Sequence, residues 1–236
     1  MISIPPVVVF EPTLANYQEL FRAGGSSLKR IFLNSIIVST MTGLLTLFLG
    51  GLAGFAFSRY RFRGDRLFTF GVLWTRTLPP IVAVVPLFLM LSNWGLVDTH
   101  IGLVLVYTAL NLPFAIWMLK SFFDAVPVEM EEAAMVDGCT RLEACRRVTV
   151  PLAAPGMAAT LIFVSVLAWN EFLFALIFSS VNAKTLPVAV VETIVEYKIY
   201  WADMAALGTI VMLPILVFSF FIQKHLVTGL TAGGIK

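Results

Sequence analysis

Five long apolar segments constrain the fold of this 236-residue chain more than any other feature. They cover residues 34–57, 67–92, 100–123, 157–180 and 203–222. A helix needs about 20 mostly apolar residues to cross the hydrocarbon core of a bilayer. Hydrophobic residues make up 59% of the chain and charged residues only 13%, too few charges for the surface of a water-soluble domain of this size. We therefore expect an all-α polytopic membrane protein with five spans.

The same composition excludes several other classes of protein. So apolar a chain is neither disordered nor a disulfide scaffold, and a net charge of +2 gives no field for binding nucleic acid. Cys139 and Cys145 fit neither a C-x-x-C motif nor metal-ligand spacing, which indicates two free thiols.

The basic residues predict the orientation of the spans, because Lys and Arg collect in cytoplasmic loops. Ten of the 16 lie in the loops after the first and third spans and in the C-terminal tail, and five lie on the other side. The C-terminus is then cytoplasmic and the N-terminus external. Since no signal sequence precedes it, we expect the natural protein to have one more N-terminal span. Residues 1–33 would form an external segment, 34–224 the transmembrane domain, and 225–236 a cytoplasmic tail.

The loop of residues 124–156 is the longest between spans and reads as two short helices. Pro127 suits a first helical turn, and Gly138 can take the left-handed conformation that ends the helix. Thr140 and Glu143 have the spacing of a capping box for the second helix, which Pro151 is expected to stop.

No motif in the sequence supports catalysis by this chain. A G-x-x-x-x-G-K-[ST] phosphate loop is missing, and His100 and His225, the two histidines, form no catalytic or metal-ligand pattern with Ser, Cys or Asp. We expect no enzyme activity, no metal and no cofactor bound by this chain.

Polar groups inside the spans point to a solute pathway, because intramembrane ionisable residues are costly and usually functional. Arg76 precedes Pro79-Pro80, which must break the helix, and Glu171 is the expected partner of Arg76. We also expect Asn111 and Pro113 to interrupt the third span. The other pathway candidates are Pro79, Asn111, Trp169 and Asn170. The alternative is that these groups only join helices or subunits.

One stretch of the long loop resembles a known family. Glu132-Ala133-Ala134 is followed after three residues by Gly138 and after nine more by Val148-x-Val150-Pro151. This is similar to the E-A-A-x3-G-x9-I-x-L-P loop of ABC-importer permeases, with two conservative changes. The segments LPP, NLPFAIW, AWNEFLFAL and GLTAGGIK extend the resemblance to the maltose-type carbohydrate permeases over nearly the whole chain.

The resemblance implies a type I ABC-importer transmembrane domain in the inner membrane of a prokaryote, moving a sugar or polyol. A loop helix would dock on separate ATPase subunits, which hold ATP and Mg²⁺. The implied partners are a homologous second permease, two nucleotide-binding ATPase subunits, an external solute-binding protein and membrane lipid. The residues implied in coupling to the ATPase are Glu131, Glu132, Ala133, Ala134, Asp137, Gly138 and Pro151.

Two other functions fit an apolar chain of this kind. An ion-coupled secondary transporter would show inverted repeats and carboxylates in several spans, and neither is evident here. A membrane scaffold without transport leaves the loop motif and Arg76 unexplained.

Overall fold

The computed structural model describes residues 13–23, 25–60, 64, 71, 74–195, 198–199 and 201–232. The long helices are α2 (Gly25–Arg59), α5 (His100–Asp124), α8 (Val150–Trp169) and α11 (Trp201–Ala232). The shorter helices are α1 (Ala15–Ala23), α4 (Pro80–Asn93), α6 (Val128–Val136), α7 (Arg141–Ala144), α9 (Leu173–Phe178) and α10 (Leu186–Val191). A 3₁₀ turn η1 (Thr75–Thr77), a π turn η2 (Cys145–Thr149) and a hairpin of β1 (Ile194–Val195) and β2 (Lys198–Ile199) complete the described elements.

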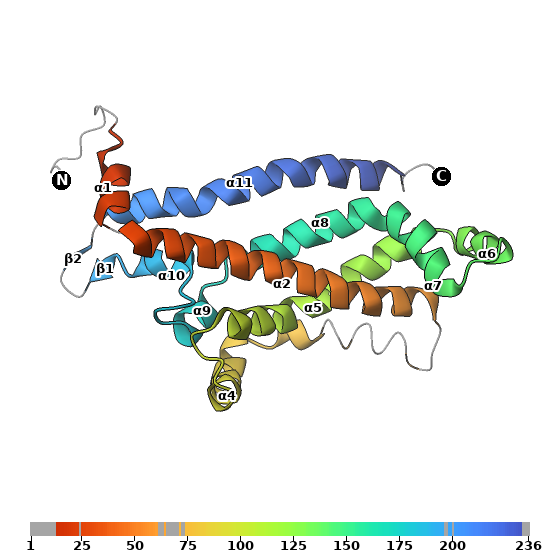
Figure 1. The fold of residues 1–236 in the computed structure, drawn as a ribbon, viewed down its shortest axis with the longest axis horizontal. Coiled ribbons are helices and arrows are strands. Elements are labelled where there is room, and N and C mark those ends of the chain that lie inside the picture. Colours follow the sequence, from red (N-terminus) through yellow and green to blue (C-terminus); the bar gives the residue numbers. More distant parts are fainter. Residues whose placement is uncertain are drawn as a thin grey trace.

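The four long helices run roughly along the long axis of the molecule (Figure 1). Within the described residues, four helical stretches are long and apolar enough to cross a membrane: Ser27–Arg59, His100–Asp124, Arg141–Trp169 and Trp201–Phe218. α6 and α7 lie at one end, which we call the loop end, and α1 and α10 lie at the opposite end. The predicted all-α membrane fold is confirmed.

The second predicted span, 67–92, is not a continuous helix where the structure describes it. Pro79 and Pro80 follow η1, and α4 begins at Pro80. α4 has 14 residues and is therefore about 21 Å long, short of the ~30 Å hydrocarbon core. The helix breaks at the two prolines, as expected. The prediction of a single span over residues 67–92 was wrong.

The third and fourth predicted spans also differ from the structure. α5 continues through Pro113 without interruption, so the expected break at Asn111 and Pro113 is wrong. Helices in a membrane tolerate proline better than helices in water do. Asn111 also stays within the helix, where its amide donates to the Tyr107 carbonyl one turn earlier at 2.8 Å. The fourth span is instead broken between Trp169 and Leu173, and its helix begins far earlier than residue 157.

α2 packs on α5 through glycines one turn apart. A Cβ atom added to Gly54 would lie 3.0 Å from the Lys120 backbone nitrogen and 3.2 Å from the Ile116 oxygen. One added to Gly50 would lie 3.3 Å from the Ala115 Cβ. In a membrane, helices gain no hydrophobic driving force from burying apolar groups against each other, and small residues that allow close approach supply the packing.

Apolar side chains of α2, α5 and α8 fill the space between these helices toward the loop end. The buried members of this cluster are Ala115, Leu119, Phe123, Val126, Ala153 and Val164. Phe55 of α2 meets Phe123 edge to face, with ring centroids 5.8 Å apart. α2, α5 and α8 are therefore closely packed against one another at the end of the bundle next to α6.

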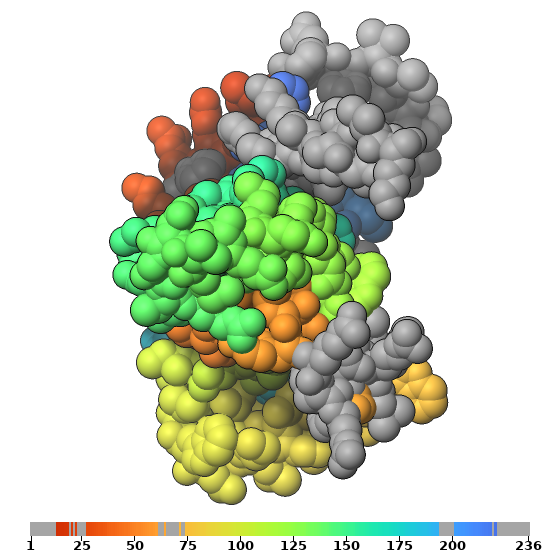
Figure 2. Space-filling model, turned by 90° about the vertical axis from the view of Figure 1, so that its right-hand side faces the viewer, coloured from red at the N-terminus to blue at the C-terminus, as the bar shows by residue number. Residues whose placement is uncertain are grey.

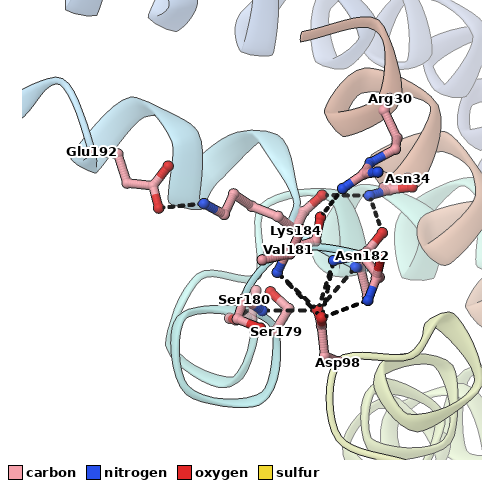
Figure 3. A network of polar contacts seen from close by, with 11 residues as sticks. Arg30, Asn34, Asp98, Ser179, Ser180, Val181, Asn182, Lys184 and Glu192 are labelled. Atoms are coloured by element: carbon pink, nitrogen blue, oxygen red, sulfur yellow. Dashed lines mark hydrogen bonds and ion pairs between the residues drawn. The ribbon is translucent and has the colours of Figure 1, made fainter. Parts of the chain in front are cut away.

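At the opposite end, the carboxylate of Asp98 organises the loop that follows α9. It accepts hydrogen bonds from the backbone N–H groups of Ser180, Val181, Asn182 and Ala183 at 2.9–3.2 Å (Figure 3). The Asp98 backbone N–H donates to the Phe178 carbonyl at 2.8 Å. Asp98 has a φ of 57°, a conformation that Asp and Asn tolerate better than most residues.

The same loop is fastened to α2. The Asn34 amide donates to the carbonyls of Asn182 and Lys184 at 2.8 and 2.9 Å, and its oxygen lies 2.7 Å from His100 Nε2. Arg30 donates to the Val181 carbonyl, as Figure 3 shows. The loop thus connects α2 with the turn between α4 and α5.

Burial of Asp98 alone would raise the pKa of its carboxyl group, but the four backbone donors outweigh this effect and hold the pKa well below its usual range. A lowered pKa means that the ionised carboxylate stabilises the fold at neutral pH. This contribution is lost as the pH falls below about 3.9, the pKa of an unfolded aspartate.

Replacing Gly54 with Leu should separate α2 from α5. The larger side chain collides with the backbone of α5, and overpacking of this kind costs about 1–3 kcal/mol in the free energy of unfolding. Gly51→Leu is the matched control, because nothing lies within 4 Å of a Cβ at that position. Thermal unfolding of the purified protein in detergent should show a lower Tm for Gly54→Leu only. Equal Tm values for the two variants would contradict this packing.

Replacing Asp98 with Asn removes the charge and keeps a residue that tolerates the same φ. We expect faster proteolysis in the loop 179–185 at pH 7, because the neutral amide is a weaker acceptor and directs an NH₂ group at the four backbone donors. Ser180→Ala is the control, since Ser180 contacts Asp98 through its backbone nitrogen. If Asp98→Asn and Ser180→Ala were cleaved at the same rate, the role of the carboxylate would be refuted.

Candidate functional site

α6 presents one face to solvent at the loop end. Glu129, Glu132, Ala133 and Val136 are exposed and follow one another around the same side of the helix. Val136 is 87% exposed, which is unusual for a β-branched apolar residue. We call these four residues the outer face of α6. Asp137, at the C-cap, is also exposed.

The turn after α6 has the conformation that the sequence predicts. Gly138 has a φ of +94°, which favours glycine over any other residue, and its backbone N–H donates to the Met135 carbonyl at 3.1 Å. Thr140 and Glu143 form the predicted capping box, in which the Thr140 hydroxyl accepts from the Glu143 N–H and the Glu143 carboxylate accepts from the Thr140 N–H. Both predictions for this turn are confirmed.

Pro151 does not end the second helix, contrary to the sequence-based expectation. α7 runs through the π turn η2 into α8, where Pro151 lies in the first turn. A proline inside a regular helix clashes with the carbonyl four residues earlier, and the wider π turn moves that carbonyl away. α7 and α8 are therefore one continuous helical segment.

Glu131 points inward, away from the outer face. Its Oε1 atom lies 2.6 Å from Arg59 Nε at the end of α2 and 2.5 Å from Thr149 Oγ1 at the end of η2. The side chains of Arg59 and Glu131 are each 4% exposed. Ala134, on the same side of α6, is half-buried. Of the residues predicted to couple to an ATPase, Glu131 and Ala134 thus face the bundle, whereas Glu132, Ala133, Asp137, Gly138 and Pro151 are exposed.

Arg59 also binds the end of α5. Its Nη2 donates to the Val126 carbonyl at 3.0 Å and its Nη1 to the Ser58 hydroxyl at 2.8 Å. The Ser58 hydroxyl donates to Asp124, which pairs with Lys120 at 2.6 Å. Seen from the loop end, the green region of α6 and α7 stands forward and adjoins the orange end of α2 (Figure 2). Arg59, Glu131 and Thr149, which we call the buried joint, therefore connect α6 with α2, α5 and α8.

Arg76 has partners other than the one predicted. Its Nη2 donates to the Asn111 side-chain oxygen at 2.9 Å, and its Nε and Nη2 lie 3.3 Å from the Leu110 carbonyl. The guanidinium also lies over the Phe114 ring, 5.4 Å from its centroid. The predicted ion pair with Glu171 was wrong, while Arg76 and Asn111, both pathway candidates, are brought together.

Glu171 lies in the break of the fourth span and binds backbone groups of the helix that follows it. Its two carboxylate oxygens accept from the backbone N–H groups of Phe174 and Ala175, each at 3.1 Å. These donors lie in the first turn of α9, where a helix leaves its N–H groups without partners. A nearby carboxylate satisfies them and also complements the positive end of the helix dipole. This local use of Glu171 explains why it does not pair with Arg76.

The remaining pathway candidates separate into buried and exposed positions. Trp169 is 3% exposed, packs edge to face on Phe32 and donates its indole N–H to the Val211 carbonyl of α11. It has no ring face available for a solute. Asn170 and Pro79 are exposed, at the C-cap of α8 and the N-cap of α4.

An aromatic pair beside Arg76 was missed from the sequence. The ring centroids of Phe114 on α5 and Phe163 on α8 lie 5.1 Å apart, and the ring centroid of Trp117 lies 6.4 Å from that of Phe114. Phe163 and Trp117 are more than one-third exposed. In a chain with 20 Phe residues, no sequence signal singles out this pair. In the described part of the chain, no three His, Cys, Asp or Glu residues come together as metal ligands.

Comparison with curated proteins shows close relatives over the whole chain. An inner membrane ABC transporter permease protein of Escherichia coli is 36% identical over 237 aligned residues, covering 100% of this chain and 85% of that protein. A trehalose transport system permease protein of Mycobacterium tuberculosis is 37% identical over 236 residues, covering 99% and 84%.

Comparison with solved structures confirms the type I ABC-importer transmembrane fold. A chain of a bacterial ABC transporter that imports the acidic polysaccharide alginate matches with a TM-score of 0.74 at 23% identity, covering 93% of this chain and 80% of that one. The family model for binding-protein-dependent transport system inner membrane components matches residues 46–231. The protein is a multi-pass permease subunit, and its chain belongs to this family of ABC-transporter inner membrane components.

Proposed function

We propose that this permease subunit imports a sugar or polyol and is driven by separate ATPase subunits that dock on the outer face of α6. The observation that carries this proposal is a short helix with exposed Glu132, Ala133 and Val136 on one side and a buried anchor on the other. Small side chains allow the backbone of a partner to approach closely, and an exposed Val136 gives that contact an apolar centre.

The charges of the subunit support a direction in the membrane. The loop end carries Arg59, Arg141, Arg146 and Arg147, and basic residues favour the cytoplasmic side. α6 and the C-terminus would then face the cytoplasm, where ATP and Mg²⁺ are bound by the ATPase subunits rather than by this chain. The loop fastened by Asp98 would face the external solute-binding protein.

The trehalose permease relative supports a carbohydrate as the solute. Arg76 and Asn111 offer hydrogen-bonding groups beside the aromatic rings of Phe114 and Phe163. Hydroxyl groups of a sugar pair with amide and guanidinium groups, and its C–H faces pack on aromatic rings. We propose that the pathway runs along these four residues and between this subunit and a homologous permease.

Replacing Ala133 with Arg should detach the ATPase subunits. The long charged side chain fills the outer face of α6 without touching the buried joint, so the subunit should still insert in the membrane. The complex is purified from native membranes through a tag on this chain, and its ATP hydrolysis and trehalose uptake into liposomes are measured. We expect both activities to fall by about 1–2 orders of magnitude, since a disrupted interface hot spot costs roughly 2 kcal/mol or more.

The matched control is Ala125→Arg, the same change at an exposed alanine at the C-cap of α5. It should leave ATP hydrolysis within about twofold of the parent. ATP-independent uptake that follows an ion gradient would instead identify a secondary transporter, and normal activity of Ala133→Arg would refute docking on the outer face.

A further inference from the structure

We propose that Glu131 is a positioning residue for energy coupling, because the buried joint makes α6 move as one body with the ends of α2, α5 and α8. This inference rests on the proposed function, since it concerns how a force applied to the outer face reaches the spans. It assigns Glu131 a task within this chain and leaves contact with the ATPase to the exposed residues of α6.

One carboxylate oxygen of Glu131 binds two elements at once. Glu131 Oε1 receives both the Arg59 Nε–H at 2.6 Å and the Thr149 hydroxyl at 2.5 Å. Hydrogen bonds to charged groups are shorter and about twice as strong as neutral ones. Because Arg59 and Glu131 are almost completely buried, water does not compete for these bonds.

The buried joint lies where the ends of several helices meet. Arg59 is the last residue of α2, and Thr149 is the last residue of η2, directly before α8. The Val126 carbonyl, which accepts from Arg59, lies just after α5. One buried pair therefore links α6 with three of the long apolar helices.

α6 is short and has few buried side chains to hold it in place. It has nine residues, and isolated helices of this length are marginal in water. Glu131 is its only buried residue. A push on the outer face would turn such a helix on its own axis unless the inner side were fixed, and the buried joint supplies that fixed point.

The other ion pairs at the loop end are local in sequence and more exposed than Arg59–Glu131. Lys120–Asp124 joins two residues of α5, and Glu143–Arg147 joins neighbouring turns with a separation of 3.8 Å. Both pairs are partly or largely exposed, and exposed pairs contribute little. Neither links α6 to a membrane-spanning helix.

The test is Glu131→Gln in the complete complex, with sugar imported per ATP hydrolysed as the readout. The amide keeps the size of the side chain but removes its charge, so α6 should loosen while its outer face stays intact. We expect the ATPase subunits to remain bound and active, and import per ATP to fall about tenfold. A merely structural role would lower ATP hydrolysis and import together and leave their ratio unchanged.

Glu143→Gln is the matched control, because it makes the same change in an exposed pair and Gln also suits a capping box. Its import per ATP should equal that of the parent. If Glu131→Gln is lost from the membrane, Arg59→Lys replaces it. Lysine keeps the charge but lacks the fork that reaches Val126, and we expect a smaller fall in the same ratio. An unchanged ratio in Glu131→Gln, or in Arg59→Lys where Glu131→Gln is lost from the membrane, would overturn the inference.

Hydrogen–deuterium exchange of the α6 backbone separates failure of this inference from failure of the proposed function. Exchange should be about tenfold faster in Glu131→Gln than in Glu143→Gln, whether or not the parent complex uses ATP. A parent complex without ATP-driven import would refute the proposed function alone. Unchanged exchange in Glu131→Gln would show that the joint does not fix α6.

Discussion

The buried ion pair between Arg59 and Glu131 is the interaction on which the loop end of this protein depends. Two charges removed from water are costly unless further hydrogen bonds satisfy them, and Thr149 and the Val126 carbonyl provide those bonds. The pair thereby determines which side of α6 faces the bundle. The opposite side is left exposed, and the exposed residues are those best suited to contact another subunit.

The rest of the bundle is stabilised in a different way, because helices in lipid gain no hydrophobic free energy from burying apolar side chains against each other. Gly50 and Gly54 let α2 approach α5 at backbone distance, and the helix ends are then held by polar groups. Asp98 has this task at one end and Glu131 at the other. Between them, the broken segment before α4 places Arg76 beside Asn111 and Phe114 of α5.

Local sequence signals predicted most long helices and the helix caps, but the interruption expected at Pro113 and the stop expected at Pro151 were wrong. The apolar runs gave the long helices, and the Gly138 turn and the Thr140–Glu143 capping box were confirmed, because each depends on residues within a few positions. The pairing of Arg76 was wrong because its partners depend on how α5 packs, and Glu171 was already used by α9. Glu131 lies beside the E-A-A motif, but only the fold reveals that it faces Arg59, 72 positions away.

The most direct test of the account is the distance between α6 and α2 during the transport cycle. Spin labels are attached to cysteines at Leu52 of α2 and at Val128, an exposed residue of α6 that lies outside the outer face, after the free thiols Cys139 and Cys145 are replaced by serine. Pulsed electron paramagnetic resonance then compares the complex with and without ATP. The account predicts one narrow distance distribution that does not change between these states. A shift or broadening of this distribution when ATP binds would show that α6 moves independently of α2 and would contradict the account.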